Sequence, residues 1–483
     1  MNSSVTDSRD ANIVGKDLLL RMNHERLNVL EKMPIQKAIV KLAVPTMLGM
    51  IIHSLYNLAD TFFIGQLNDP NAVAAVTMAF PVFMIINALG SLFSVGGASY
   101  ISRALGRKDI KGASKGASIA FMFSIASGVL MAILAFMNLD QLLTFIGTTE
   151  QTMLLTKNYL SYVIVFTPVM LLQVSLGGIL RSEGASKEST IGMVIGTVVN
   201  IILDPLFILT FNMGVQGAAI ATVIGNCFGV AYYILYFLRK KSVITISPKL
   251  FSFDREIIFD IVKIGLPVAL NQVLTSFISA YANAVAASYS ENVIASMGIV
   301  MRASSMAFTL IFGLSMGYQP IAGFCYGGKL YKRLMDGFKV TVMYGSSLAL
   351  FFAALLYIFA PVIIKAFIDN AEVIELGTRI MRAHALPMPF MSLQMTIMSS
   401  FQAMGKAMQS MIISLGRQGL FFLPLLIILN KLYQLDGFIY AQPAADFFTT
   451  FLSLTLFLLV WKDMKQELSL NRDKEPEPSL ERA

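Results

Sequence analysis

The chain has 483 residues, of which 56% are hydrophobic and only 14% charged, and its formal net charge is +8. A soluble domain carries about 25% charged residues, so this composition excludes an ordinary water-soluble enzyme and indicates a chain surrounded by lipid. The basic residues gather in short segments between apolar runs, which argues against binding of nucleic acid.

The predicted elements are apolar helices between two polar tails. Residues 1–37 are polar and contain no apolar core of signal-peptide length, so we expect a cytoplasmic tail there and another over 462–483. Between them lie about twelve apolar runs, which do not alternate as the strands of a β-barrel would. They predict an all-α integral membrane protein, with helices near 38–64, 72–102, 112–138, 154–180, 188–211, 215–238, 261–288, 294–325, 334–363, 374–402, 408–430 and 437–461.

The connections between these helices alternate in charge. Lys and Arg occur in every second connection, as in 103–115 and 239–263, whereas Gly65–Asn71, Phe211–Gln216 and Ser288–Asn292 have neither. Basic connections stay on the cytoplasmic side of a membrane. The pattern therefore predicts an even number of crossings with both termini in the cytoplasm.

The chain also repeats itself at a nearly constant spacing. The stretch Lys41–Pro45 is echoed 222 residues later by Lys263–Pro267, and Gly106–Lys108 is echoed 221 residues later by Gly327–Lys329. This repeat predicts two six-helix lobes of the same orientation: an N-lobe over 38–238, a cytoplasmic linker over 239–260, and a C-lobe over 261–461. Parallel repeats of this kind are typical of transporters.

Ionisable residues inside membrane helices are costly and therefore indicate function. Asp60 lies in the first helix, and Asp204 lies in the fifth, one turn after Asn200, while Thr222 adds a hydroxyl in the sixth. Two carboxylates, an amide and a hydroxyl can hold a hard cation such as Na⁺, or share a proton. The alternative is a hydrogen-bonded cluster that only joins helices.

The first helix carries further polar residues on the stripe of Asp60. His53, Tyr56 and Asn57 precede Asp60 by seven, four and three residues, so they share its face of the helix. Pro45 lies in the same helix and leaves the carbonyl of Lys41 without its backbone donor, which predicts a bend.

The second lobe differs chemically from the first. Ala282 stands at the repeat position of Asp60, so we expect any ion coupling to belong to the N-lobe. The C-lobe instead contains Arg302, Arg417 and Asp446, for which we expect internal pairing, with Arg417 next to Asp446.

Two local features at the predicted cytoplasmic side indicate no chemistry. Glu183 is expected to pair with Arg181 or Lys187 in a loop. The stretch Gly323–Lys329 resembles a phosphate-binding loop but is followed by Leu330 where Ser or Thr is needed. We therefore expect no ATP hydrolysis and no cofactor.

These residues resemble the multidrug and toxic compound extrusion (MATE) family over roughly 35–462. Pro45, Tyr56, Asn57 and Asp60 resemble its first helix, while Asn200, Asp204, Pro205 and Thr222 resemble helices five and six of its DinF-like branch. Gln319–Gly323 and Ala441–Asp446 resemble second-lobe segments of MepA-type bacterial members.

The resemblance implies a V-shaped transporter that exports organic cations in exchange for H⁺ or Na⁺. It implies coupling at Asp60, Asn200, Asp204 and Thr222, a helix bend at Pro45, and a cavity lined by His53, Tyr56, Asn57, Gln173 and Asn226. His53 replaces the amide that the family more often has at that position.

The sequence thus predicts a secondary active multidrug efflux transporter in the cytoplasmic membrane, with lipophilic cationic drugs as partners. We expect a monomer surrounded by membrane lipid. A flippase for lipid-linked oligosaccharides of the same superfamily is an alternative, and it would need several cationic residues inside its cavity. A membrane-embedded transferase is a weaker one, because no catalytic His/Asp or Asp-rich cluster is visible.

Overall fold

The computed structural model describes residues 26–67 and 69–472, without the side chains of 57, 58, 61 and 467–472. Within these ranges the chain is helical and contains no strand. The first half comprises α2 (Ile35–Gly65), α3 (Pro70–Gly106), α4 (Ile110–Met137), α5 (Leu139–Phe145), α6 (Glu150–Val165), α7 (Thr167–Ser182), α8 (Ser186–Pro205), the π-helix η1 (Leu206–Thr210) and α9 (Gly214–Leu238). After the short 3₁₀ turn η2 (Pro248–Leu250), the second half comprises α10 (Arg255–Tyr289), α11 (Glu291–Gly327), α12 (Tyr331–Phe367), α13 (Ala371–Ala385), α14 (Met388–Met404), α15 (Ala407–Leu415), the π-helix η3 (Gly416–Phe422) and α16 (Leu423–Arg472).

Short polar residues begin several of these helices. The side chains of Asp69, Asp109, Asp254, Ser290 and Asn370 each accept a hydrogen bond from a backbone N–H in the first turn of the helix that follows. Such caps satisfy donors that would otherwise have no partner. Lys115 also donates a hydrogen bond to Asp254, and this bond lowers the pKa of that exposed carboxyl below its usual value.

The helices cross the membrane about twelve times, as the sequence predicts. Nine helices among the described residues are long and apolar enough to cross singly, and α6 with α7, bent by 53°, makes a tenth. The helical stretch from α15 to α16 supplies two crossings, because the backbone leaves helical geometry at Gln434 and the chain then turns back. The reversal brings Asp446 next to Arg417, which a straight helix would hold about 43 Å away at 1.5 Å per residue. Helices α13 and α14 together supply the remaining crossing.

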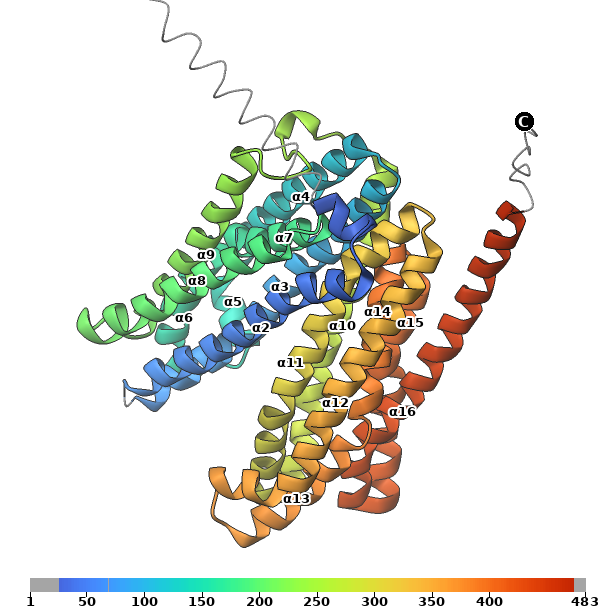
Figure 1. Ribbon diagram of the computed structural model, residues 1–483. Coiled ribbons are helices and arrows are strands. Elements are labelled where there is room, and N and C mark those ends of the chain that lie inside the picture. The colour runs from blue at the N-terminus through green and yellow to red at the C-terminus, as the bar shows by residue number, and fades with distance from the viewer. Residues whose placement is uncertain (1–25, 68, 473–483) are drawn as a thin grey trace, which may run out of the picture.

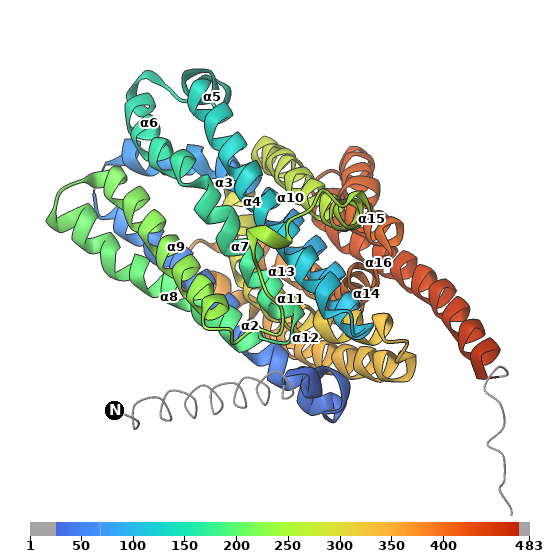
Figure 2. The same cartoon turned by 90° about the horizontal axis from the view of Figure 1, so that it is seen from above.

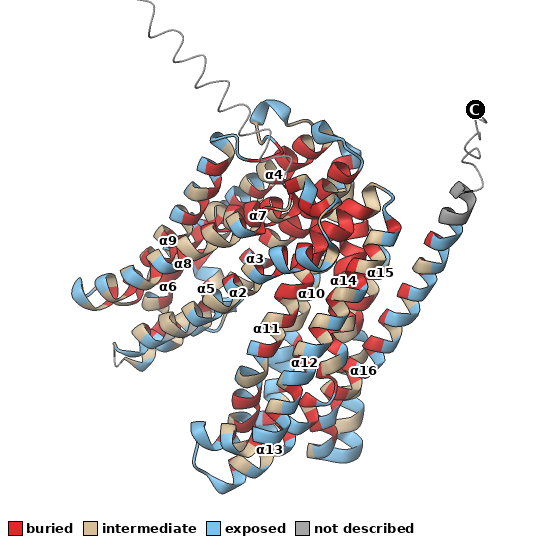
Figure 3. Cartoon of the chain, in the orientation of Figure 1, coloured by how far each residue is buried: buried red, intermediate tan, exposed pale blue. Residues whose placement is uncertain are grey.

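The two halves form two lobes arranged as a V (Figure 1). Helix α10 packs against α3, and α11 packs against α2, so these four helices form the inner walls of the V (Figure 2). The lobes meet at the end that carries the basic connections and separate toward the opposite end. Buried residues concentrate where the lobes meet, and one continuous core there includes Leu42, Leu105, Ile321 and Phe324 from both lobes (Figure 3). Each lobe has a smaller core of its own farther along.

Glycines allow the backbones of α3 and α11 to touch at this junction. A Cβ atom on Gly106 would lie 2.0 Å from the carbonyl oxygen of Phe324, and one on Gly327 would lie 2.1 Å from that of Arg103. Gly327 follows Gly106 by 221 residues, and Phe324 follows Arg103 by the same number. The two contacts are therefore related by the internal repeat.

The segment before α2 joins the two lobes on the same side. Arg26 contacts the N-lobe: it donates to the carbonyl of Lys241 and lies 3.3 Å from Glu188 and 3.7 Å from Glu183. Arg333 of α12 contacts the segment from the C-lobe, donating to the carbonyl oxygens of Leu30 at 2.8 Å and Val29 at 3.1 Å. We call residues 26–33 the bridging segment.

The expected pairing of Glu183 with Arg181 or Lys187 is wrong. Glu183 is completely buried, and it accepts hydrogen bonds from the Ser242 hydroxyl at 2.6 Å and the Val243 backbone N–H at 2.9 Å. Its cationic neighbour is Arg26. A sequence argument overlooked these partners because they lie about 60 and 157 residues away along the chain.

Candidate functional site

Three helices of the N-lobe bring the predicted coupling residues together. Asp60 lies on α2, Asn200 and Asp204 lie on α8, and Thr222 lies on α9. Helices α8 and α9 approach closely because Gly196 and Gly225 face each other: a Cβ on Gly225 would lie 2.5 Å from the carbonyl oxygen of Gly196. Asn200 lies one turn after Gly196, so this close packing places its amide against Thr222.

Asn200 links the other polar groups. With its amide oriented so that both ends are satisfied, the nitrogen donates to Asp204 Oδ2 at 3.1 Å, and the oxygen accepts from the Thr222 backbone N–H at 2.9 Å and hydroxyl at 3.3 Å. The Tyr56 hydroxyl lies 3.4 Å from the Thr222 hydroxyl, which connects α2 to the same network. Asp204 is completely buried, and Asn200 and Thr222 are almost so.

Asp60 differs from Asp204 in having an unsatisfied oxygen. Asp60 Oδ1 is buried and has no hydrogen-bond partner among the described residues. The charges of Asp60 and Asp204 are close enough to interact. Buried polar atoms are normally hydrogen-bonded, and two neighbouring carboxylates resist simultaneous ionisation. The arrangement therefore suits a proton or a hard cation held by oxygen ligands.

The donor set is consistent with Na⁺ but with no metal that prefers nitrogen or sulfur. Asp60, Asp204 and Thr222 offer oxygen atoms only, which hard cations prefer. Among the described residues no group of three or more His, Cys, Asp or Glu side chains comes together. The same oxygens can accept a proton, so the geometry is compatible with either ion.

The residues predicted to line the cavity fall into two groups. His53 is exposed, and its ring centroid lies 5.8 Å from that of half-buried Tyr56. Gln173 instead packs between helices: its side-chain amide lies about 2.5 Å from where a Cβ on Gly229 would be, and its Oε1 has no partner among the described residues. Asn226 donates to the Thr222 carbonyl at 2.8 Å. Asn57 lies outside the described side chains.

Pro45 lies inside α2, about four turns before Asp60. The hydroxyl of the next residue, Thr46, donates to the carbonyl of Leu42 at 2.9 Å. The carbonyl of Lys41 lacks its usual helical donor, so this part of α2 is held less tightly than the rest.

The charged residues of the C-lobe form a separate arrangement. Arg417 Nε donates to Asp446 Oδ1 at 2.7 Å, and Gln442 donates to the same oxygen at 3.2 Å, so the expected Arg417–Asp446 pair is confirmed. The Arg417 guanidinium also lies 5.7 Å from the centre of the Phe308 ring. Arg302 is exposed on α11, and Ala282, the counterpart of Asp60, is buried.

Comparison with known proteins identifies the class of transporter. The MatE family model matches residues 45–206 and again residues 267–428, once in each lobe. The chain therefore belongs to the MatE family, and it is a membrane transporter rather than an enzyme.

Particular relatives agree with this assignment. The chain is 30% identical over 427 residues to the multidrug export protein MepA of Staphylococcus aureus, covering 88% of this chain and 94% of that protein. It is 28% identical to MepA of Staphylococcus saprophyticus, covering 91% and 96%. Among solved structures, MATE in complex with MaL6 superimposes with a TM-score of 0.86 at 26% identity, covering 91% of this chain and 99% of the other. The outward-facing conformation of a multidrug resistance MATE transporter also gives 0.86, at 27% identity and 91% and 98% coverage.

Proposed function

We propose that this chain exports lipophilic organic cations in exchange for H⁺ or Na⁺, coupled through Asp60 and Asp204. The observation that carries the proposal is the buried, unpartnered oxygen of Asp60 next to a second buried carboxylate. A cluster that only joined helices would satisfy its own atoms, as Asn200, Asp204 and Thr222 do among themselves. Membership of a family that includes multidrug export proteins supports the direction and the class of cargo.

The proposed mechanism relies on a difference in ion affinity between two conformations. A ligand shifts an equilibrium only by its differential affinity for the two states. When H⁺ or Na⁺ binds the oxygens of Asp60 and Asp204, one negative charge of the pair is neutralised and α2 can pack more closely against α8. Tyr56 transmits this change, because it touches Thr222 and lies on the same helix as Asp60. Pro45 gives α2 a point at which to adjust.

The proposed cargo path lies between the inner walls of the V. His53 and Tyr56 present rings near the wall formed by α2, and rings provide faces for lipophilic cations. The V opens away from the basic connections, so the positive-inside rule makes this state outward-facing. We place both termini in the cytoplasm and the protein in the cell membrane as a monomer.

A flippase for anionic lipid-linked glycans is disfavoured by the C-lobe. Such a carrier needs several unpaired cations along its cavity. Arg417 is neutralised by Asp446, which leaves Arg302 as the one exposed arginine among the described residues of α11. Transport of lipid-linked precursors but not of cationic dyes would favour the flippase instead.

The coupling assignment can be tested with Asp60→Asn and Asp204→Asn in everted vesicles. We expect uptake of a cationic dye to fall roughly tenfold, within the usual range of coupling between sites. Asp140→Asn changes an exposed carboxylate, with a side chain 75% exposed, and should leave uptake unchanged. Wild-type rates in Asp60→Asn under the same gradient would contradict the assignment. Imposing pH and Na⁺ gradients separately identifies the coupling ion.

A further inference from the structure

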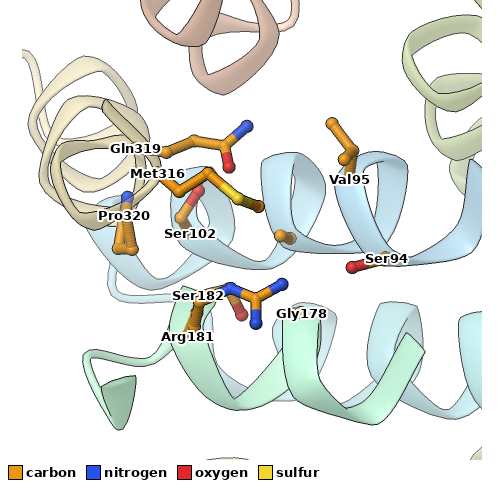
Figure 4. Close-up of a pocket in the computed structure, with 10 residues that line it drawn as sticks. Ser94, Val95, Ser102, Gly178, Arg181, Ser182, Met316, Gln319 and Pro320 are labelled. Carbon is orange, nitrogen blue, oxygen red and sulfur yellow. The ribbon is translucent and has the colours of Figure 1, made fainter. Parts of the chain in front are cut away.

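A small cavity lies where the two lobes meet, away from the carboxylates of the proposed coupling site. Figure 4 shows its walls: Ser94 and Ser102 from α3, Arg181 and Ser182 from α7, and Gln319 from α11. The first four residues belong to the N-lobe and Gln319 to the C-lobe. The cavity has a volume of about 10 Å³, which is room for one occupant of about the size of a water molecule.

The cavity contains a positive charge without a counter-ion. Among the described residues, no carboxylate lies within ion-pair distance of Arg181, whose NH1 donates to the Ser189 hydroxyl at 3.0 Å. Its neighbour in sequence, Glu183, is occupied by Arg26 and the backbone of Val243. A guanidinium has five donors, and burying its charge without compensation is unfavourable. The cavity is therefore suited to an anion rather than to a cation.

A second, independent feature also points to a ligand. Ser94 is 3% exposed, its hydroxyl has no hydrogen-bond partner among the described residues, and Figure 4 shows it directed toward the cavity. Helix packing holds it in place, because a Cβ on Gly178 would lie 2.1 Å from its oxygen. The hydroxyls of Ser102 and Ser182 donate to carbonyls of their own helices, at 3.2 and 2.6 Å. They can rotate toward an occupant that accepts hydrogen bonds.

We propose that this cavity binds a single-atom anion of the chloride class, held by Arg181 and Ser94 and covered by Gln319. Its size excludes phosphate, sulfate and the carboxylate of a drug. Because the walls come from both lobes, the anion stabilises the state in which the lobes are joined at this end. Separation of the lobes removes α11 from the cavity and releases the anion. The inference does not depend on which cargo or coupling ion the transporter uses.

The test uses the purified full-length protein in detergent, with thermal unfolding followed at constant sodium concentration and ionic strength. We expect chloride and bromide to raise the Tm saturably relative to gluconate. Arg181→Gln should abolish this rise. Lys187→Gln removes the same charge from an exposed position nearby and should keep it. Equal Tm values in chloride and gluconate for the wild-type protein would overturn the proposal.

A second variant and a second readout cover the case in which Arg181→Gln does not fold. Ser94→Val fills the cavity and keeps Arg181, so it should fold and lose the dependence on chloride. Full chloride dependence in Ser94→Val would overturn the proposal. Crystals grown in bromide should show an anomalous peak between Arg181 and Ser94, whereas water there, with anomalous peaks only elsewhere, would also overturn it.

Discussion

Buried carboxylates in the two lobes have different surroundings. Asp446 has a charged partner, Arg417, and an amide donor, Gln442. Asp60 has an oxygen with no partner among the described residues, although it lies in an equally apolar helix. Membrane helices rarely hold unsatisfied polar atoms without a functional reason, so this difference separates a structural pair from a candidate coupling site.

The Arg417–Asp446 pair yields a prediction about stability. Asp446→Ala leaves a guanidinium that is only 20% exposed without its partner, and we expect it to cost about 3 kcal/mol. Unfolding in detergent measures this loss. The double variant Arg417→Met with Asp446→Leu removes both charges and should recover most of it. A double variant less stable than Asp446→Ala would show that the pair is not the source of the effect.

The Asp254 cap predicts a local dependence on pH. The hydrogen bond from Lys115 lowers the pKa of Asp254, so its stabilising effect is present above the unfolded value of 3.8 and is lost as the pH falls through the lower folded value. Protection factors for hydrogen exchange at the amides of Glu256 and Ile257 should therefore decrease in that acidic window. Asp254→Asn keeps a capping oxygen but does not titrate, so its protection should not change with pH there. The same acid response in both proteins would count against the cap.

At the scale of the helix, apolar length and charge alternation were enough to predict the architecture. Each predicted run corresponds to a crossing in the structure, because a membrane helix satisfies its own backbone and depends little on distant partners. Interruptions within the runs were not predicted. The break at Phe166 between α6 and α7, and the π-helices η1 and η3, leave hydropathy nearly unchanged.

The candidate site was predicted in composition but only partly in geometry. Asp60, Asp204, Asn200 and Thr222 stand out because polar residues are rare in apolar helices, and the structure brings them together. The structure alone showed that Gln173 packs against α9 and that Arg181 faces a cavity between lobes. Such contacts join helices far apart in sequence, and no local pattern reports them.

The junction of α3 and α11 makes a prediction at this scale. Gly106→Val places a side chain against the Phe324 carbonyl, so we expect the basic ends of the lobes to separate. Spin labels at Lys111→Cys and Lys332→Cys, both exposed, report this distance after the native cysteines, Cys227 and Cys325, are replaced by Ser. The distance should lengthen in Gly106→Val. Gly298→Val is the control, because a Cβ there meets nothing within 4 Å. An unchanged distance in Gly106→Val would contradict the prediction.

At the scale of the whole molecule, the bridging segment ties the two lobes together through Arg26 and Arg333. Opening on this side must break one of these attachments. Arg333→Gln removes the bonds to Val29 and Leu30, so we expect the same pair of spin labels to report a larger open population. Lys339→Gln changes an exposed charge on the same helix and should have no effect. Identical distance distributions in Arg333→Gln and wild type would show that the segment does not restrain opening.

The reciprocal contacts of Gly106 with Phe324 and of Gly327 with Arg103 bear on the origin of the fold. In a symmetric dimer, a residue of the first subunit touches a residue of the second, and the equivalent contact recurs with the roles exchanged. The two lobes meet in this way across the junction. A six-helix protein with this junction could pair with a second copy of itself, with both copies inserted in the same direction. Gene fusion would then need to supply only a linker, and the fused halves could diverge until one of them alone kept the acidic pair.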